Sequence, residues 1–153
     1  RADLISQSTG ATVLPKLSLS GLATQLASVS GVIAVDTGLG HLAAALARPT
    51  LSLYGPTDPG LSGTYGVSQK HLCSTFACAP CLKKTCAYKG PAVLDNDKTV
   101  APPCFSTHPP ASVWQTFEVL LAKAALGRPK SLYDTSGYNT GSYDTNDNGS
   151  TGK

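Results

Sequence analysis

An alternation of short apolar runs with helix-forming segments in the first third of the chain is the feature that most constrains the fold. The apolar runs, residues 12–14, 32–35 and 50–54, have the length and composition of short buried strands. Segments with helical spacing of Leu and Ala, residues 18–30 and 40–47, separate them. The order strand, helix, strand, helix, strand predicts an α/β fold built on a parallel sheet.

The rest of the chain divides into a loop, a helix and a tail. The loop, residues 55–111, holds eight of the eleven prolines and all five cysteines, so we expect something other than core packing to organise it. Apolar residues then recur on one face of a predicted helix that begins at Ser112, stops at residues 127–129 and packs on the sheet. Residues 1–130 would form one unit, and the polar residues 131–153 a disordered tail. A tail whose regularly spaced tyrosines promote self-association is the alternative.

Composition excludes several classes of protein. The chain has 153 residues, 14% of them charged, and a formal net charge of +3. Because no basic cluster is longer than Lys83-Lys84, we do not expect a phosphate-neutralising surface for nucleic acid. Apolar runs long enough to span a membrane are absent from the sequence. The chain contains no Met and starts at Arg1, which suggests that it begins inside a longer protein.

The candidate binding site is the turn that follows the apolar run at residues 32–35 and opens the next helix. It consists of Asp36, Thr37, Gly38, Leu39, Gly40 and His41. Gly38 and Gly40 leave room for a phosphate to approach the free N–H groups of the helix, whose dipole favours negative charge. Asp36 would accept hydrogen bonds from sugar hydroxyls, and Thr37 would cap the helix or bind the phosphate. Plain turn and N-cap chemistry, with His41 as an ordinary helix residue, is the alternative that spacing alone leaves open.

A second loop, residues 55–60, follows the next predicted strand. Parallel strands end at one edge of a sheet, so this Gly-, Thr- and Asp-bearing loop is expected to converge with the turn after residue 35. A plain turn at residues 58–60 is the alternative.

These motifs together resemble a known family. Residues 14–19, residues 35–46 (VDTGLGHLAAAL) and residues 53–60 (LYGPTDPG) are similar to the carboxyl-terminal half of bacterial ADP-heptose:lipopolysaccharide heptosyltransferases, glycosyltransferase family 9, and most closely to its heptosyltransferase I group. The resemblance continues through the cysteine motifs to Val113-Trp114 and covers about residues 3–128.

The resemblance implies a GT-B glycosyltransferase with its active site between two Rossmann-like domains. Residues 1–130 would be an incomplete carboxyl-terminal domain, with a partial Rossmann-like sheet truncated at its start. Such enzymes transfer heptose from ADP-heptose to Kdo of the lipid A inner core, with inversion and without an essential metal, at the cytoplasmic face of the inner membrane. Asp36 would contact the heptose hydroxyls, and Thr37 to His41 would surround the diphosphate.

The resemblance also implies what this chain lacks. In the family, the general base is a carboxylate of the amino-terminal domain, so no catalytic residue is expected here and the chain alone is expected to be inactive. Gly40 stands where the family commonly has Ser or Thr, which removes one hydroxyl donor but keeps the backbone N–H.

The cysteines form a separate motif. The spacing is C-x2-C followed by C-x4-C and a distant cysteine, and thiolates at such spacings can hold a tetrahedral ion. The preferred ligands of a structural zinc ion are Cys78, Cys81, Cys86 and Cys104. An iron–sulfur cluster, a redox pair and reduced free thiols are the alternatives, and free thiols are favoured over a metal. A metal-organised, non-catalytic binding module is accordingly the alternative function.

Overall fold

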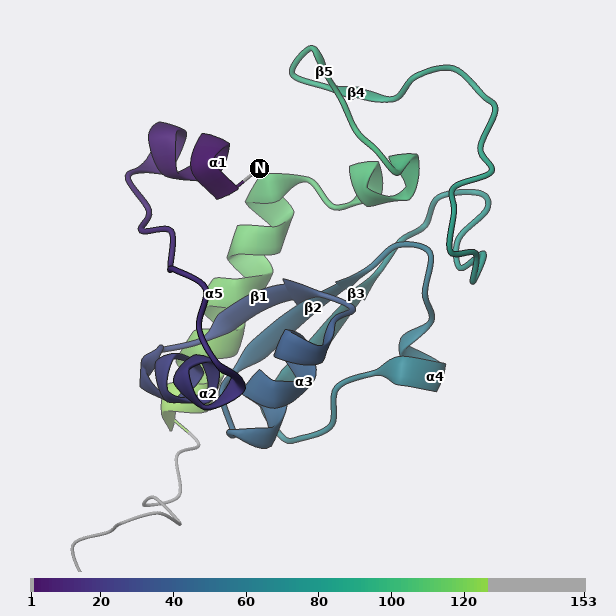
Figure 1. Cartoon of the computed structure of the whole chain (residues 1–153). Helices are drawn as coiled ribbons and strands as arrows, with labels where there is room; N and C mark the ends of the chain where they lie inside the picture. Colours follow the sequence, from purple (N-terminus) through teal and green to yellow (C-terminus); the bar gives the residue numbers. More distant parts are fainter. Residues whose placement is uncertain (1, 127–153) are drawn as a thin grey trace, which may run out of the picture.

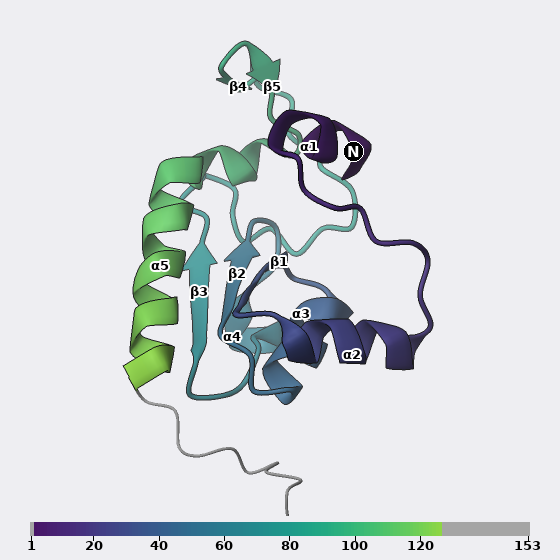
Figure 2. The same ribbon diagram turned by 90° about the vertical axis from the view of Figure 1, so that its left-hand side faces the viewer.

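The fold is a small parallel sheet with helices on both faces. The computed structural model describes residues 2–126. Three strands, β1 (Val32–Val35), β2 (Thr50–Tyr54) and β3 (Gln69–Cys73), form the sheet in the order β1-β2-β3. Figure 2 shows helix α5 (Pro110–Leu126) on one side of the sheet and helices α2 (Leu19–Ser28) and α3 (Gly38–Ala45) on the other. The predicted α/β class is therefore confirmed.

Two of the three predicted strands are present, at the predicted residues, and one prediction is wrong. Residues 12–14 join no sheet; Val13 and Leu14 are 45% and 49% exposed. Pro15 ends this run after three residues and offers no N–H to a sheet ladder. The third strand is instead β3, Gln-Lys-His-Leu-Cys, whose polar residues hide it from an apolar-run search.

The helices begin close to their predicted starts. Ser18 caps α2, its side chain accepting a hydrogen bond from Gly21 N at 3.2 Å. Helix α3 begins two residues earlier than predicted, at Gly38, and α5 begins at Pro110 rather than Ser112. Proline suits the first turn of a helix because its missing N–H would have no intrahelical partner there. No helix in the described part of the chain is long and apolar enough to cross a membrane.

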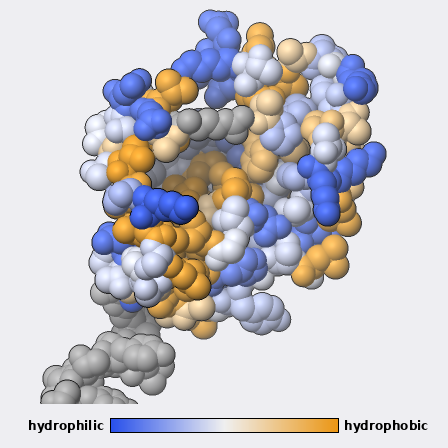
Figure 3. Space-filling model, viewed as in Figure 1, coloured by the Kyte–Doolittle hydropathy of each residue, from blue (hydrophilic) through white to orange (hydrophobic). Residues whose placement is uncertain are grey.

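The core lies between the sheet and α5. Leu51 of β2 is fully buried against Val113 and Phe117, and four partly buried leucines surround them: Leu53, Leu72, Leu120 and Leu121. Close approach at the start of β1 requires Gly31, where a Cβ would lie 2.6 Å from Leu121 Cδ2. On the other face of the sheet, α3 packs against β1 and β2. Apolar side chains gather on the surface over α2 and α3 (Figure 3), the helices that carry the exposed Leu19 and Leu39.

The Cys- and Pro-rich segment that follows β3 folds back on the sheet without a core of its own. It contains the short hairpin of β4 (Leu94–Asp95) and β5 (Lys98–Thr99), which projects away from the sheet (Figure 1), and the 3-10 helix η1 (Pro103–Thr107). Two further helices are α1 (Ala2–Thr9) and α4 (Pro59–Ser62). The predicted tail, residues 131–153, and the predicted end of the unit 1–130 lie outside the described residues, as does the helix stop at residues 127–129.

Candidate functional site

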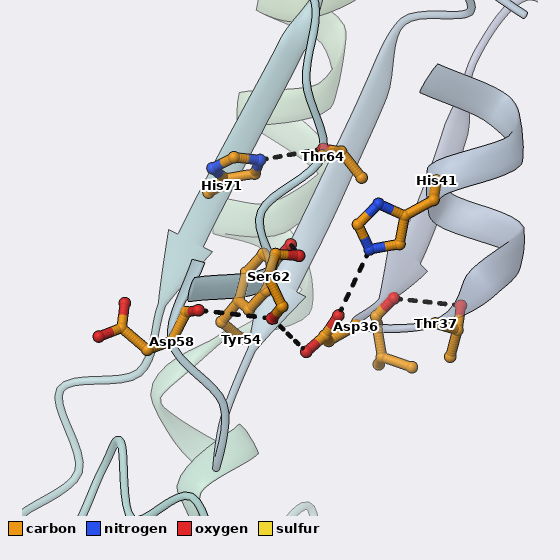
Figure 4. A network of polar contacts seen from close by, with 9 residues as sticks. Asp36, Thr37, His41, Tyr54, Asp58, Ser62, Thr64 and His71 are labelled. Carbon is orange, nitrogen blue, oxygen red and sulfur yellow. Dashed lines mark hydrogen bonds and ion pairs between the residues drawn. The ribbon is translucent and has the colours of Figure 1, made fainter. Parts of the chain in front are cut away.

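The candidate site lies at the edge of the sheet where the parallel strands end. Asp36 follows β1, the loop at residues 55–60 follows β2, and Ser74 follows β3. A direct contact joins Asp36 to the helix α4 that continues the second loop: Ser62 Oγ, at the end of α4, donates a 2.8 Å hydrogen bond to Asp36 Oδ2 (Figure 4). The two loops therefore converge as predicted.

Asp36 is held from two sides. Ser62 binds one carboxylate oxygen, while His41 Nε2 lies 3.8 Å from the other oxygen, Asp36 Oδ1. The Asp36 side chain is 19% exposed and that of His41 is 45% exposed. A partly shielded carboxylate beside an accessible imidazole can accept hydrogen bonds from a ligand while remaining in one orientation.

The amino terminus of α3 is open. Thr37 occupies the N-cap position, but its side chain makes no capping hydrogen bond, and its hydroxyl donates instead to Val35 O at 3.3 Å. The first N–H groups of the helix are thus available to an anion, which the helix dipole favours. Beside them, a Cβ at Gly38 would meet nothing within 4 Å, and Leu39 is 45% exposed.

Gly40 has different surroundings from Gly38. It is buried, and a Cβ built there would lie 3.3 Å from Ala34 Cβ and 3.8 Å from Ser52 Oγ. Its N–H donates to Thr37 O at 3.0 Å. The absence of a side chain at Gly40 therefore lets α3 pack closely on the sheet. At Gly38, the absence of a side chain leaves open space beside the start of the helix.

Asp58 supports the second loop. Its Oδ1 accepts from Gly60 N at 2.8 Å, and its carbonyl accepts from the N–H groups of Leu61 and Ser62. This is N-cap chemistry, and its result is to present Ser62 to Asp36. A cavity of about 170 Å³ opens beside it, lined by Gly55, Thr57, Asp58, Pro59, Cys73, Ser74 and Pro80.

Tyr54, at the end of β2, supports Ser62 through a hydrogen bond to its backbone. Its ring is 1% exposed, and its hydroxyl donates to Ser62 O at 3.4 Å. Burial raises the pKa of Tyr54, and the negative charge of Asp36 adds to the rise. His71 of β3 packs edge-on against this ring with a centroid separation of 5.3 Å, and its Nε2 shares a 2.9 Å hydrogen bond with Thr64 Oγ1.

Sequence reasoning did not identify Ser62, Tyr54, Thr64 or His71 as parts of the site. Ser62 carried a usable signal, because it lies four residues after Asp58, the distance that aligns side chains on one helical turn. The other three come together only through the pairing of β2 with β3, which the sequence did not predict.

The four cysteines of the predicted metal set come together in one place. Cys78, Cys81, Cys86 and Cys104 all line a cavity of about 80 Å³, together with Pro56, Ala79, Lys83, Lys84, Pro102 and Pro103. Burial raises the pKa of Cys104, and the other three thiols contribute to the rise. All five cysteines are free, and within residues 2–126 no three His, Cys, Asp or Glu side chains are already grouped as ligands of one ion.

The sequence is similar to known proteins over much of its length. The model of glycosyltransferase family 9 (heptosyltransferase) matches residues 1–91. Lipopolysaccharide heptosyltransferase 1 of Pseudomonas aeruginosa is 55% identical over 115 residues, which are 72% of this chain and 32% of that protein. The protein of the same name from Escherichia coli K12 is 61% identical over 57 residues, 37% of this chain and 18% of that protein.

A solved structure is also similar. E. coli heptosyltransferase WaaC with ADP is 52% identical, with 45% of this chain and 22% of that chain covered and a TM-score of 0.43. The present chain thus spans about a third or less of the length of the relatives that it matches. Because the family model matches more than half of its residues, the chain belongs to glycosyltransferase family 9, the heptosyltransferase family.

Proposed function

We propose that this chain binds the donor ADP-heptose for a GT-B heptosyltransferase that transfers heptose to Kdo of the lipid A inner core. The observation that carries the proposal is the position of Asp36 and His41 beside the open amino terminus of α3. The similarity to proteins named lipopolysaccharide heptosyltransferase 1 supports heptose as the transferred sugar. The proposed location is the cytoplasmic face of the inner membrane, where the lipid acceptor would be reached.

The proposed binding mode assigns the diphosphate to the start of α3. The free N–H groups of Gly38 and Leu39 would donate to phosphate oxygens, and the Thr37 hydroxyl can turn from Val35 O to do the same. His41 follows one turn later and would add positive charge when protonated. The backbone N–H of Gly40 contributes less, because it is bonded to Thr37 O.

Asp36 is proposed to bind the heptose. Its carboxylate is acceptor-only when ionised, which suits sugar hydroxyls, and Ser62 holds one of its oxygens in place. A sugar hydroxyl would bind the remaining lone pairs or displace Ser62. The cavity lined by Asp58 and Ser74 lies at the same edge of the sheet, at the ends of β2 and β3, and would offer further space for the donor.

The proposed reaction is a single displacement with inversion. An acceptor hydroxyl attacks the anomeric carbon of the heptose, the new C–O bond forms as the bond to the diphosphate breaks, and ADP leaves. The start of α3 and His41 would stabilise the charge on the leaving ADP, so the proposal needs no metal ion. The base that takes the acceptor proton is proposed to belong to another part of the enzyme, as the family resemblance implies.

Calorimetric titration of the full chain with ADP and with ADP-heptose tests this assignment. We expect both ligands to bind to the unmodified chain. In Asp36→Ala, the affinity for ADP should stay within about threefold, because Asp36 contacts only the sugar in this proposal. The same variant should lose most of the additional affinity that ADP-heptose has over ADP. Asp97→Asn is the matched control, because Asp97 lies in the exposed β4–β5 turn and Asn tolerates its positive φ of 63°. Equal loss in both variants, or no binding of either ligand to the unmodified chain, would contradict the proposal.

The cavity lined by Cys78, Cys81, Cys86 and Cys104, here called the cysteine cavity, favours one second candidate, a non-catalytic module organised by a metal. The titration with ADP and ADP-heptose, together with a measurement of metal binding, distinguishes this candidate from the donor-binding function. A folded chain that binds a metal ion but neither ADP nor ADP-heptose would support this candidate over the donor-binding function.

A further inference from the structure

We propose that Cys78, Cys81, Cys86 and Cys104 bind one zinc ion, and that this ion fixes the cysteine-rich segment, residues 74–104, to the edge of the sheet at which β2 and β3 end. The site is separate from Asp36 and its neighbours, and it does not depend on the function proposed above.

Cysteines from two separate parts of the chain converge on the cysteine cavity. Three of the cysteines lie within nine residues of one loop, whereas Cys104 belongs to η1, eighteen residues after Cys86. All four nevertheless line the same cavity, and Cys73, the remaining cysteine, does not. Four thiolates at about 2.3 Å from the metal form the usual closed, tetrahedral coordination of structural zinc.

The cysteine-rich segment also has few buried side chains to hold it in place. No residue from 74 to 102 is buried, although this part of the chain is described throughout. A long segment without buried apolar side chains gains little from the hydrophobic effect and is expected to open readily. A metal ion bound by residues at both ends of the segment would supply the missing cross-link.

Hydrogen bonds and close contacts anchor the cysteine cavity to the sheet. Leu82 N, next to Cys81, donates a 2.8 Å hydrogen bond to Pro56 O in the loop after β2. Cys104 Sγ lies only 2.9 Å from the position of a Cβ on Gly55. Ser74 Oγ, after β3, donates to Cys104 O at 2.8 Å. Two of the four ligands are thus tied to the ends of β2 and β3.

The charges around the cavity complete the argument. Four thiolates and one Zn²⁺ carry a net charge of −2, which would be unfavourable at a site that includes the buried Cys104 if nothing balanced it. Lys83 and Lys84 both line the cavity, and their two positive charges match the excess. Cys78 and Cys86 are exposed, and zinc binding would draw them toward the buried Cys104. Zinc binding would therefore close the loop around the ion, as in sites that form only when the metal binds.

Metal content of the full chain tests the proposal. The untagged protein is purified with a reductant, dialysed against micromolar zinc and then against buffer, and analysed by mass spectrometry for metals. We expect about one zinc per chain, and less than about a fifth of that in Cys81→Ser and in Cys104→Ser, because three thiolates bind the ion much more weakly. Cys73→Ser is the matched control and should retain the full zinc content.

Cobalt keeps the test decisive if a serine variant fails to fold. Titration of the unmodified chain with Co²⁺ should give the absorption bands of tetrahedral cobalt bound by thiolates, and addition of zinc should remove them. A folded, reduced chain without zinc and without these bands would overturn the proposal. Bound iron with sulfide, a native disulfide between Cys78 and Cys81, or equal loss of zinc in Cys73→Ser would also overturn it.

Discussion

Ser62 Oγ donates a 2.8 Å hydrogen bond to Asp36 Oδ2, and this bond joins the loops that follow two neighbouring strands. The residues are 26 positions apart in sequence and meet because parallel strands end at one edge of the sheet. Asp36 is the proposed sugar-binding carboxylate, so its orientation depends on a residue that need not touch the sugar.

Replacing Ser62 with Ala should lower both the stability of the chain and its preference for ADP-heptose over ADP. Loss of the hydrogen bond to a carboxylate should reduce the free energy of unfolding by about 1 kcal/mol, which urea denaturation would measure. The affinity for ADP should remain unchanged, whereas the additional affinity for ADP-heptose should decrease, because the carboxylate is no longer held in one orientation. Ser28→Ala, in α2, removes an exposed hydroxyl with only a local partner and is the control. Equal effects of the two variants would show that Ser62 does not position Asp36.

Tyr54 should make the protein less stable in alkali. Burial raises the pKa of Tyr54 above its usual value of about 10, so the folded state keeps the phenol proton when the unfolded state has lost it. The contribution of Tyr54 to stability is therefore complete below about pH 10 and declines as the pH rises further. Urea denaturation between about pH 8 and 11 should show a shallower decline for Tyr54→Phe than for the unmodified chain.

The control for this pH dependence is Tyr65→Phe, since Tyr65 is 94% exposed. Its pH profile should follow that of the unmodified chain. If Tyr54→Phe also followed it, the decline in alkali would come from groups other than Tyr54.

Leu51 should dominate the stability of the core. It is fully buried between the sheet and α5, in contact with Val113 and Phe117. Leu51→Ala should lower the free energy of unfolding by about 2–5 kcal/mol, through lost burial and the cavity that remains. Leu61→Ala, at a side chain that is 75% exposed, should change it by less than about 0.5 kcal/mol. Similar losses in chemical denaturation would show that α5 does not pack on β2 as described.

The sequence predicted those parts of the fold that rest on local patterns. The apolar strands β1 and β2 and the capped helix α2 belong to this group, since each is marked by its own residues. Strand β3 was missed because Lys70 and His71 interrupt its apolar pattern, and it forms because β2 offers it a partner. Residues 12–14 show the opposite case, in which an apolar run finds no partner.

The same distinction applies to the candidate site. Asp36 and the turn to His41 could be predicted because the strand, the glycines and the helix are adjacent in sequence. Tyr54 had no such local signal, and Ser62 had only its spacing from Asp58. Their contribution depends on the short helix α4, which brings Ser62 to Asp36 and to the Tyr54 hydroxyl. For the cysteines, spacing indicated a set of ligands, but only the packing of η1 against Gly55 brings Cys104 to the cavity.

Gly38→Ala should weaken the binding of ADP without disturbing the fold. A Cβ at this position meets no protein atom within 4 Å, so Gly38→Ala should keep the fold, and the helical preference of Ala should maintain or raise stability by up to about 1 kcal/mol. In the proposed binding mode, however, the added methyl group occupies the space through which the diphosphate reaches the N–H groups of α3. The affinity for ADP should therefore fall by about tenfold, a loss of about 1.4 kcal/mol that calorimetric titration would measure.

Gly21→Ala is the matched control, because Gly21 also lies near the start of a helix, α2, and its Cβ would make ordinary contacts of 3.4 Å with Leu17 Cβ and Ser18 Oγ. It should leave ADP affinity unchanged. A Gly38→Ala protein that binds ADP as tightly as the Gly21→Ala protein would mean that the diphosphate does not approach the start of α3, and the sugar nucleotide would then have to lie elsewhere along the edge of the sheet. Because the substitution leaves Asp36 and its partners intact, that result would bear on the diphosphate position alone.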